Sequence, residues 1–508
     1  MTSKQNPFGI ASILLVVGGL FVISTFRAEA FARLSISNRW SKHASADTTT
    51  LLPPKSINFR GTNLPAAPEE NTDGLDGADA LEFCAPKLLD GIAFNLFGIG
   101  RKDDETSTNG AFQPPKDSMT GMVVVITGSS SGLGQESAKR LALAGATVIV
   151  TAPTPGETTD AVQAVRNYCL GGPNPSIDGK GIFVNQTPIV RGIPLDLADF
   201  SSVQTFPDRY RESMLSLSKI SNRDEKAGKI LNPPKTTTQK IHVLMNNACG
   251  GTPQKREITV DGNELIFQSG YLGHFVLTAR LFEEGLLNNE AAMADSGEKE
   301  IVSGCTIINV SSSAHQSAEI YTGEAFGESK NPTYGFDFDN INSELEFSYG
   351  TYSRTKLANI MFTKELQRRT DNLATFDNSS DSKNSSSSRS WLTAVSVDPG
   401  LSATKIWEKS APILSKVPFL SALFSKFLTT VERGANAHVW LAYASSSESN
   451  IQLVSGQHYD ESRNPVPASR FANQHESNEK LWELSEEMGG LRFDPAIPPS
   501  GHNSKKDE

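Results

Sequence analysis

A tyrosine and a lysine at helical spacing are candidates for acid–base chemistry in this chain. Tyr352 and Lys356 lie one helical turn apart, so the phenol and the ammonium group face the same way. A phenol with an ordinary pKa of about 10 is a poor acid or base at neutral pH, but a lysine cation beside it favours the phenolate. Such a pair also arises by chance on exposed helices. Ser312 supports the catalytic interpretation, because it follows the strand-like run Thr306–Val310 at the sheet edge where doubly wound folds bind ligands.

A glycine-rich turn predicts a nucleotide cofactor. The run Val123–Thr127 is β-branched and apolar, as in a buried parallel strand, and it leads into Gly128-x-x-x-Gly132-x-Gly134 and a helical stretch. Glycines let backbone N–H groups approach a pyrophosphate, and the positive end of the following helix favours its charge. A glycine triplet alone could be only a tight turn. Its place between a strand and a helix makes it a variant of the dinucleotide-binding fingerprint.

The elements that must position these residues alternate between strands and helices from Gly121 onward. This order predicts an α/β fold, a Rossmann-type doubly wound parallel sheet in a single catalytic domain with surface insertions. The expected strands are 123–127, 147–151, 190–195, 241–245, 305–310, 392–397 and 452–459. Polar stretches at about 221–240 and 371–390 are expected to be surface insertions.

Six motifs in this order resemble the short-chain dehydrogenase/reductases over about residues 121–491. The motifs are Thr127-Gly128-x-x-x-Gly132-x-Gly134, Asp196-Leu197, Asn246-Asn247-Ala248, Ser312, Tyr352-x-x-x-Lys356 and Pro399-Gly400. Four further segments are similar to the retinol-dehydrogenase branch: Asp261-Gly262, Leu272-Gly273-His274-Phe275, Lys356-Leu357-Ala358-Asn359 and Leu481–Glu486.

The resemblance implies a role for each motif. A reduced nicotinamide would pass hydride to a substrate carbonyl that Ser312 polarises and Tyr352 protonates, while Lys356 lowers the tyrosine pKa and holds the nicotinamide ribose. Asn246 and Ala248 would line the adenosine side. The residues implied at the cofactor are Thr127, Gly128, Ser130, Gly132, Leu133, Gly134, Asp196, Leu197, Asn246, Ala248, Tyr352, Lys356, Pro399, Gly400 and Thr404.

Gly270 departs from the family pattern. The family usually has Asn at this position, which kinks a helix and holds a water that relays protons to the lysine. Glycine has no side chain for that purpose and costs about 1 kcal/mol in a helix interior relative to alanine. Reduced or lost activity is therefore expected unless Gln268, Ser269 or Tyr271 substitutes.

The end of the second strand is also unusual. Related enzymes place a basic residue there for the 2′-phosphate of NADP, and NAD users place an Asp. This chain has Ala152-Pro153-Thr154, with only the hydroxyls of Thr151 and Thr154 to donate. The branch implies NADP, and NAD stays open.

An apolar segment follows the Pro399-Gly400 motif. The segment 406–428 is rich in Ile, Leu, Val and Phe, and it either packs in the core or forms a lid over the substrate. A lid would imply a small lipophilic carbonyl or alcohol, such as a retinoid, a carotenoid-derived carbonyl, a lipid aldehyde or a steroid-like ketone. A protochlorophyllide-type reductase is the alternative enzyme, and a non-catalytic NADP-sensing interaction module is the alternative of another class. The sequence indicates no oligomeric state.

The N-terminus reads as a targeting segment. The apolar stretch 8–26 is followed by Ala28-x-Ala30, the small residues that signal peptidase requires, and 31–50 is hydroxyl-rich and poor in acids. This order resembles the bipartite presequence of algae with complex plastids and predicts plastid localisation. The alternative is a membrane anchor at 8–26 in the endoplasmic reticulum. The expected organisation is a signal peptide or membrane anchor (1–30), a transit-peptide-like or tether segment (31–66), a poorly ordered linker with a short apolar helix (67–118), the catalytic domain (119–495) and a disordered tail (496–508).

Charge and cysteine content narrow the function. The formal net charge of -10 argues against a nucleic-acid partner, which would require a basic face. The four cysteines form no C-x-x-C pair and no metal-ligand spacing, so neither a disulfide framework nor a metal site is expected.

Overall fold

The computed structural model describes residues 110–171, 188–226, 240–250, 255–288, 304–319, 336, 338–344, 349–376, 391–400, 402 and 429–495. The chain divides into two units, Met1–Asp76 and Gly77–Glu508, and all described residues belong to the second. The predicted targeting segments (1–30 and 31–66), the short apolar helix, the apolar segment 406–428 and the 496–508 tail lie outside the described residues.

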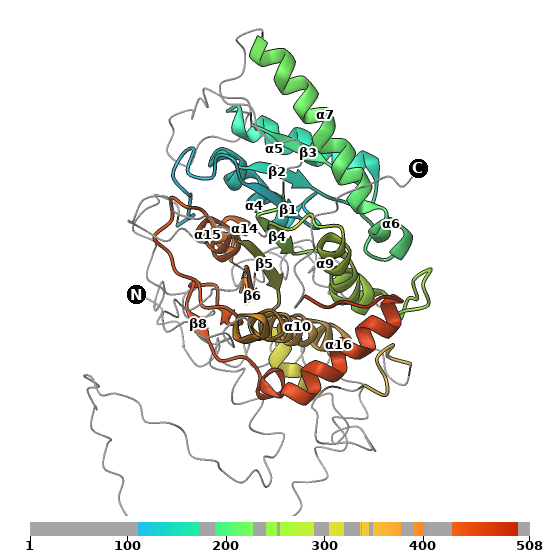
Figure 1. Cartoon of the computed structure of the whole chain (residues 1–508). Helices are drawn as coiled ribbons and strands as arrows, with labels where there is room; N and C mark the ends of the chain where they lie inside the picture. Colours follow the sequence, from blue (N-terminus) through green and yellow to red (C-terminus); the bar gives the residue numbers. More distant parts are fainter. Residues whose placement is uncertain are drawn as a thin grey trace, which may run out of the picture. The chain divides into compact units, whose positions relative to one another are not determined.

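Within the described residues, one eight-stranded sheet has the order β3-β2-β1-β4-β5-β6-β7-β8. The strands are β1 (Val123–Ile126), β2 (Thr147–Val150), β3 (Val190–Gly192), β4 (Val243–Asn246), β5 (Cys305–Val310), β6 (Leu392–Val397), β7 (His458–Tyr459) and β8 (Pro465–Val466). The pairs from β3 to β7 are parallel, and β8 is antiparallel to β7. The predicted doubly wound sheet is confirmed, with the strand order reversing between β1 and β4 (Figure 1).

The seventh predicted strand was wrong over most of its length. Residues 452–457 are not in a strand, and only His458–Tyr459 pairs with β6. The reason is a turn in which the Gln457 N–H donates to the Val454 carbonyl and Gly456 adopts a positive φ of 74°. The edge strand β8 was not predicted.

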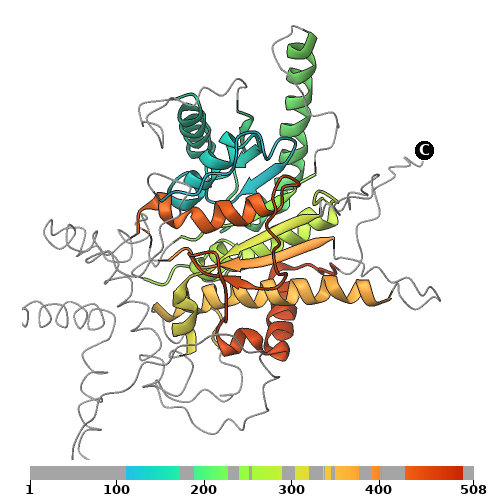
Figure 2. The same ribbon diagram turned by 90° about the vertical axis from the view of Figure 1, so that its left-hand side faces the viewer.

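Alternating strand residues supply the two faces of the sheet. Val123 and Val125 pack into one apolar cluster, whereas Val124 and Ile126 pack into the other. Over the first face lie α6 (Phe200–Gln204), α7 (Phe206–Lys226), α8 (Leu265–Phe267), the π-helical turn η1 (Gln268–Leu272), α9 (Gly273–Glu283), α10 (Tyr349–Phe376) and α16 (His475–Gly489). Over the second lie α4 (Gly132–Leu143), α5 (Pro155–Cys169), α14 (Val431–Gly434) and α15 (Asn436–Ala444). Figure 2 shows the resulting three layers, with α10 along one side of the sheet.

Two helices extend into predicted surface insertions. α7 continues to Lys226 and α10 to Phe376, so the stretches expected at 221–240 and 371–390 begin as helix. Two short 3-10 helices, η2 (Ser313–Glu319) and η4 (Arg470–Asn473), complete the described elements.

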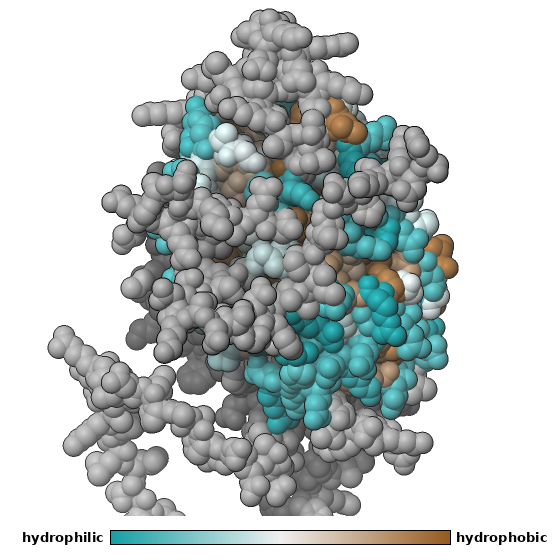
Figure 3. Space-filling model, viewed as in Figure 1, coloured by the Kyte–Doolittle hydropathy of each residue, from teal (hydrophilic) through white to brown (hydrophobic). Residues whose placement is uncertain are grey.

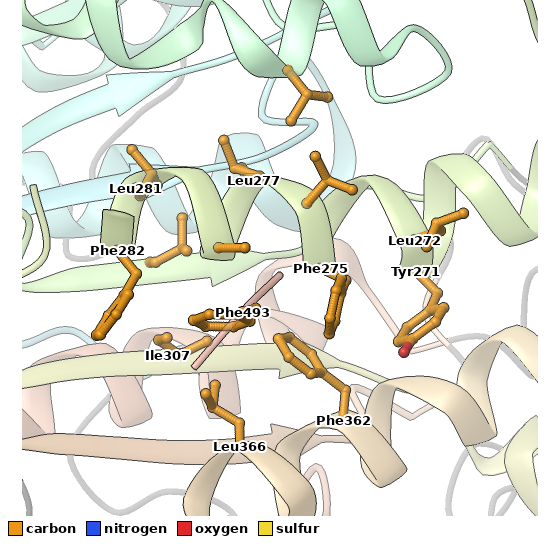
Figure 4. Close-up of a cluster of buried hydrophobic side chains, with 14 of the residues drawn as sticks. Tyr271, Leu272, Phe275, Leu277, Leu281, Phe282, Ile307, Phe362, Leu366 and Phe493 are labelled. Atoms are coloured by element: carbon orange, nitrogen blue, oxygen red, sulfur yellow. The ribbon is translucent and has the colours of Figure 1, made fainter. Parts of the chain in front are cut away.

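An aromatic cluster fixes α9, α10 and α16 against one another. The Phe275 ring lies 5.4 Å from Phe362, 5.0 Å from Trp482 and 5.8 Å from Phe493, measured between centroids. Figure 4 shows Phe275 and Phe362 facing each other from their two helices. Such contacts add to the burial of apolar area, so this cluster sets the spacing of the helices that carry the site.

The segment ahead of residue 119 packs on the domain. The fully buried Arg140 of α4 donates to the Phe112 carbonyl at 3.1 Å and to Asn436 Oδ1 at 2.8 Å. Asn436 also bonds the backbone of Gly110 and Phe112. Among the described residues, contacts with the domain therefore extend from Gly110, ahead of the expected boundary at 119.

The surface over α16 is polar. The buried side of this helix includes Leu481 and Trp482, whereas Lys480, Glu483 and Glu487 are exposed. Figure 3 shows hydrophilic side chains gathered over this lower part of the molecule. Among the described residues, no helix is both long enough and apolar enough to cross a membrane.

One buried histidine makes stability depend on pH. His438 of α15 is fully buried, and in the described part of the chain neither ring nitrogen has a hydrogen-bond partner. Burial, with smaller contributions from Lys356 and Arg140, lowers the pKa of His438 from its ordinary 6.5 to about 3. Between these values the unfolded chain binds a proton that the folded chain does not, so stability falls as the pH falls.

His438→Leu should therefore stabilise the protein most at acid pH. Between pH 6 and pH 4 the slope of the free energy of unfolding against pH should decrease by roughly 1 kcal/mol per pH unit. Denaturant unfolding at several pH values measures this slope. An unchanged slope would contradict a neutral, buried His438.

Candidate functional site

Two glycines bring the turn after β1 close to its neighbours. Gly128 has φ +60°, and a Cβ there would lie 2.8 Å from Ala248 Cβ. A Cβ at Gly134 would lie 2.7 Å from the Gly128 carbonyl oxygen and 2.6 Å from Asn247 Nδ2. Both positions therefore require glycine. The turn leads into the N-terminus of α4 at the carboxyl edge of the sheet, as a pyrophosphate site needs.

Asn247 holds this turn. Its Nδ2 donates to the Thr127 carbonyl at 2.9 Å and to the Gly128 carbonyl at 3.3 Å, and its backbone N–H donates to Thr127 Oγ1 at 2.8 Å. The neighbouring Asn246, which we expected at the adenosine side, turns its side chain into the core, where Nδ2 donates to Asn309 Oδ1 at 2.8 Å. Asn247 was not among the predicted site residues, although it lies in the Asn-Asn-Ala motif noted in the sequence.

The two threonine hydroxyls that follow β2 already form hydrogen bonds within the protein. Thr151 is buried, and its Oγ1 accepts the Gly128 N–H at 3.3 Å. Thr154 begins α5 with a capping box, in which its hydroxyl donates to Glu157 Oε2 at 2.8 Å and accepts the Glu157 N–H at 3.3 Å. A carboxylate, rather than a cation, thus stands at this strand end.

The other predicted cofactor residues are distributed around the same edge. Ser130, Gly132 and Leu133 are half-buried in the turn and first turn of α4. Asp196 accepts the Ala198 N–H at 2.9 Å in the loop after β3, and the carbonyl of the buried Leu197 accepts from Gln268 at 3.3 Å. Pro399 and Gly400 follow β6, with Gly400 at φ +71°. Thr404 lies outside the described residues.

The end of β5 holds the catalytic helix. The Lys356 ammonium donates to the Val310 carbonyl at 3.0 Å, and Ser311 Oγ donates to the Lys356 carbonyl at 2.8 Å. Lys356 is 3% exposed, and its Nζ lies 5.6 Å from the centroid of the half-buried Tyr352 ring. The predicted pair is therefore together, with the cation beside the phenol.

Ser312 immediately precedes the 3-10 helix η2, which packs beside α10. Its Oγ accepts the Ala314 N–H at 3.3 Å, so its own hydrogen can be donated to a substrate oxygen. His315 Nδ1 bonds the Ser312 carbonyl at 2.7 Å, and its Nε2 accepts the Ser469 N–H at 3.3 Å. His315, which sequence reasoning missed, thus fixes the backbone of Ser312.

A buried histidine links the glycine turn to η1. Thr127 Oγ1 accepts the backbone N–H groups of Asn247 and Ala248, and it lies 2.8 Å from His274 Nε2. Donating its hydrogen to Nε2 leaves the proton of a neutral ring on Nδ1, which lies 3.3 Å from the Gly270 carbonyl. Burial and then Lys356 lower the pKa of His274 to about 3, which keeps the ring neutral.

Gly270 lies in the π-helical turn, where its neighbours leave no room for a side chain. A Cβ there would lie 2.8 Å from Thr355 Cγ2 and 3.1 Å from Cys249 Sγ. The side chains proposed as substitutes bond elsewhere: Gln268 to Thr259, Asn263, Asp261 and Leu197, Ser269 to Leu265, and Tyr271 to Ser485. Asn359 of α10 instead reaches the Gly270 carbonyl, with Nδ2 at 3.2 Å.

The arrangement defines a class of protein: a dinucleotide-binding α/β enzyme with a Ser, Tyr and Lys set at the carboxyl edge of its sheet. Comparison with known proteins agrees. The family profile for short chain dehydrogenases matches residues 122–172. Human retinol dehydrogenase 12 is 26% identical over 377 residues, which cover 74% of this chain and 89% of that protein. Human retinol dehydrogenase 14 is 28% identical over 379 residues, with 73% and 88% covered.

Among solved structures, an uncharacterized protein from Mycobacterium paratuberculosis aligns with 24% identity and a TM-score of 0.46, covering 75% of this chain and 99% of that one. In its fold, its ordered motifs and its sequence relatives, the chain is similar to the short-chain dehydrogenase/reductases of the retinol-dehydrogenase-like branch. This similarity supports an oxidoreductase that acts on CH–OH and C=O groups with NAD(P).

The Glu157 carboxylate should affect the choice between the two cofactors. The end of β2 is where the adenosine ribose binds in this fold, and a carboxylate there repels a 2′-phosphate. Glu157→Gln should raise the ratio of kcat/KM with NADPH to kcat/KM with NADH about fivefold, which corresponds to ~1 kcal/mol. Glutamine can keep the capping box.

Glu476→Gln is the matched control, because it removes a first-turn carboxylate from α16 instead of α5. Steady-state kinetics with both cofactors measure the ratio. The same ratio in wild type and Glu157→Gln would show that this carboxylate does not face the ribose.

Proposed function

We propose that this enzyme interconverts a carbonyl and an alcohol on a small lipophilic substrate, with Tyr352 as the acid and base. The observation that carries the proposal is the Lys356 ammonium, buried and bonded to the Val310 carbonyl, 5.6 Å from the Tyr352 ring centroid. A cation so placed favours the phenolate of Tyr352.

Each residue then has one task in reduction. The half-buried Ser312 hydroxyl polarises the substrate carbonyl, and Tyr352 gives its proton to the oxygen. The glycine turn at Gly128 and the N-terminus of α4 hold the pyrophosphate. The nicotinamide supplies or takes the hydride when bound.

Two observations support a lipophilic substrate. The sequence relatives are named retinol dehydrogenases, which names a lipophilic alcohol for those proteins. The segment 406–428, which is either core packing or a lid, is rich in apolar residues, and as a lid it would cover a lipophilic substrate. For the cofactor, the branch favours NADP, whereas the Glu157 carboxylate at the end of β2 accommodates NAD more easily.

Tyr352→Phe should lower turnover by at least about 100-fold, because it removes only the proton that the reaction transfers. Cofactor binding, followed by the fluorescence of NADPH or NADH, should persist. Tyr443→Phe is the matched control, since Tyr443 lies on α15 and its hydroxyl donates to the Glu448 carbonyl, and this variant should turn over normally.

The assay for Tyr352→Phe is a screen of lipophilic aldehydes, ketones and alcohols with both cofactors. Full activity of Tyr352→Phe would refute the proposed role of the phenol. Wild-type protein that binds cofactor but turns over nothing in the screen would favour the interaction module instead. A light-triggered absorbance change in pigment-loaded protein would favour the protochlorophyllide-type reductase.

For localisation, we propose that residues 1–66 direct the enzyme to a complex plastid. The support is the order of the sequence: the apolar stretch 8–26, Ala28-x-Ala30, and then an acid-poor, hydroxyl-rich segment. A fluorescent fusion to residues 1–60 should label the plastid. Labelling of the endoplasmic reticulum would support a membrane anchor at 8–26, and a cytosolic signal would contradict both.

A further inference from the structure

Asn359 connects η1 to the strand end that holds the lysine. Its Nδ2 donates to the Gly270 carbonyl at 3.2 Å and to the Val310 carbonyl at 3.0 Å. The Val310 carbonyl also accepts the Lys356 ammonium at 3.0 Å. Asn359 is 2% exposed, so both amide hydrogens are used inside the protein.

We infer that Asn359 is a positioning residue that keeps the Lys356 ammonium beside Tyr352. The inference rests on the proposed roles of Tyr352 and Lys356. Among the described residues, the hydrogen-bond acceptor of the Lys356 ammonium is the carbonyl of Val310, the last residue of β5. The Asn359 amide fixes the direction of that carbonyl by bonding it and the facing turn together.

The π-helical turn cannot make this connection itself. A side chain at Gly270 would meet Thr355 Cγ2 at 2.8 Å and Cys249 Sγ at 3.1 Å. The carbonyl of Gly270 is therefore the group that faces α10, and the amide must come from α10. Asn359 stands three residues after Lys356, on the adjacent turn of the same helix.

The π-helical turn η1 is also fixed on the side that faces the glycine turn. His274 Nδ1, 3.3 Å from the Gly270 carbonyl, is a second donor to it, and His274 Nε2 accepts from Thr127 at the end of β1. In the described part of the chain, the titratable groups around this network are Lys356, Tyr352, His274 and Cys249, and His438 of α15 also faces Lys356. A rigid path thus runs from the glycine turn to the lysine, and Asn359 is its link between helices.

The test compares two substitutions on α10. Asn359→Leu keeps the shape but removes both donors. Thr363→Val is the control, because Thr363 accepts from Asn309 and donates to the Asn359 backbone carbonyl, and bonds neither Gly270 nor Val310. Asn359→Ala is a second, smaller variant in case leucine prevents folding, and thermal unfolding of each variant identifies folded protein.

The measurement is the pH profile of kcat for alcohol oxidation, in which the phenolate is the base. In Asn359→Leu and Asn359→Ala the midpoint of the rise should move up by about one pH unit, with about a tenfold loss of kcat near neutral pH. KM for the cofactor should change less than kcat, and Thr363→Val should keep the wild-type midpoint.

Midpoints in both Asn359 variants that coincide with wild type, with losses of stability like that of Thr363→Val, would overturn the inference and leave Asn359 a structural residue. A failure of the proposed function looks different. In that case Tyr352→Phe keeps full activity, whatever the Asn359 variants do.

Discussion

The carbonyl of Val310 is the group on which the placement of Lys356 beside Tyr352 depends. It is the last carbonyl of a central strand, and it accepts one hydrogen bond from Lys356 and one from Asn359. The next residue, Ser311, bonds the Lys356 backbone carbonyl at 2.8 Å. A flexible lysine loses much rotamer freedom when it is fixed, so its position is only as exact as the groups that hold it. Here those groups belong to a strand whose six residues are all buried.

The same logic applies to the cofactor edge. Thr127 directly follows β1, and its hydroxyl accepts the backbone N–H groups of Asn247 and Ala248 after β4. These are the two strands between which the sheet order reverses, where a doubly wound fold opens a crevice. The glycine turn and the helix that carries Tyr352 are therefore both fixed to the same sheet, and not to loops that could move independently.

Strand positions were readable from the sequence because β1, β2, β5 and β6 are β-branched runs buried on both faces. It was harder to predict from the sequence which side of the sheet each residue at a strand end faces. Asn246 and Asn247 differ by one position, and one step in a strand reverses the direction of a side chain. The family motif contains both, so only the structure separates the asparagine that bonds Asn309 from the one that holds the turn.

Contacts across long sequence distances were beyond sequence reasoning. From the sequence, Gly270 was interpreted as the loss of a side chain that the family usually has. Helix propensity alone predicts only that glycine destabilises a helix. Its compensation lies 89 residues further along the chain, in the Asn359 amide, and no periodicity relates the two positions. In the sequence, Asn359 was noted only as part of a motif typical of the retinol-dehydrogenase branch, and no role was predicted for it.

The π-helical turn explains why that compensation is possible. In such a turn one extra residue enters the helix, so a carbonyl is released from the regular ladder and can accept bonds from elsewhere. Gly270 lies at the middle of the turn, and its carbonyl receives His274 Nδ1 from the same segment and Asn359 Nδ2 from α10. A larger residue would push away Thr355 of α10, and with it the helix that carries Lys356. Glycine at this position is therefore consistent with an intact site, because what the turn contributes to Asn359 is a backbone carbonyl, and a backbone carbonyl needs no side chain.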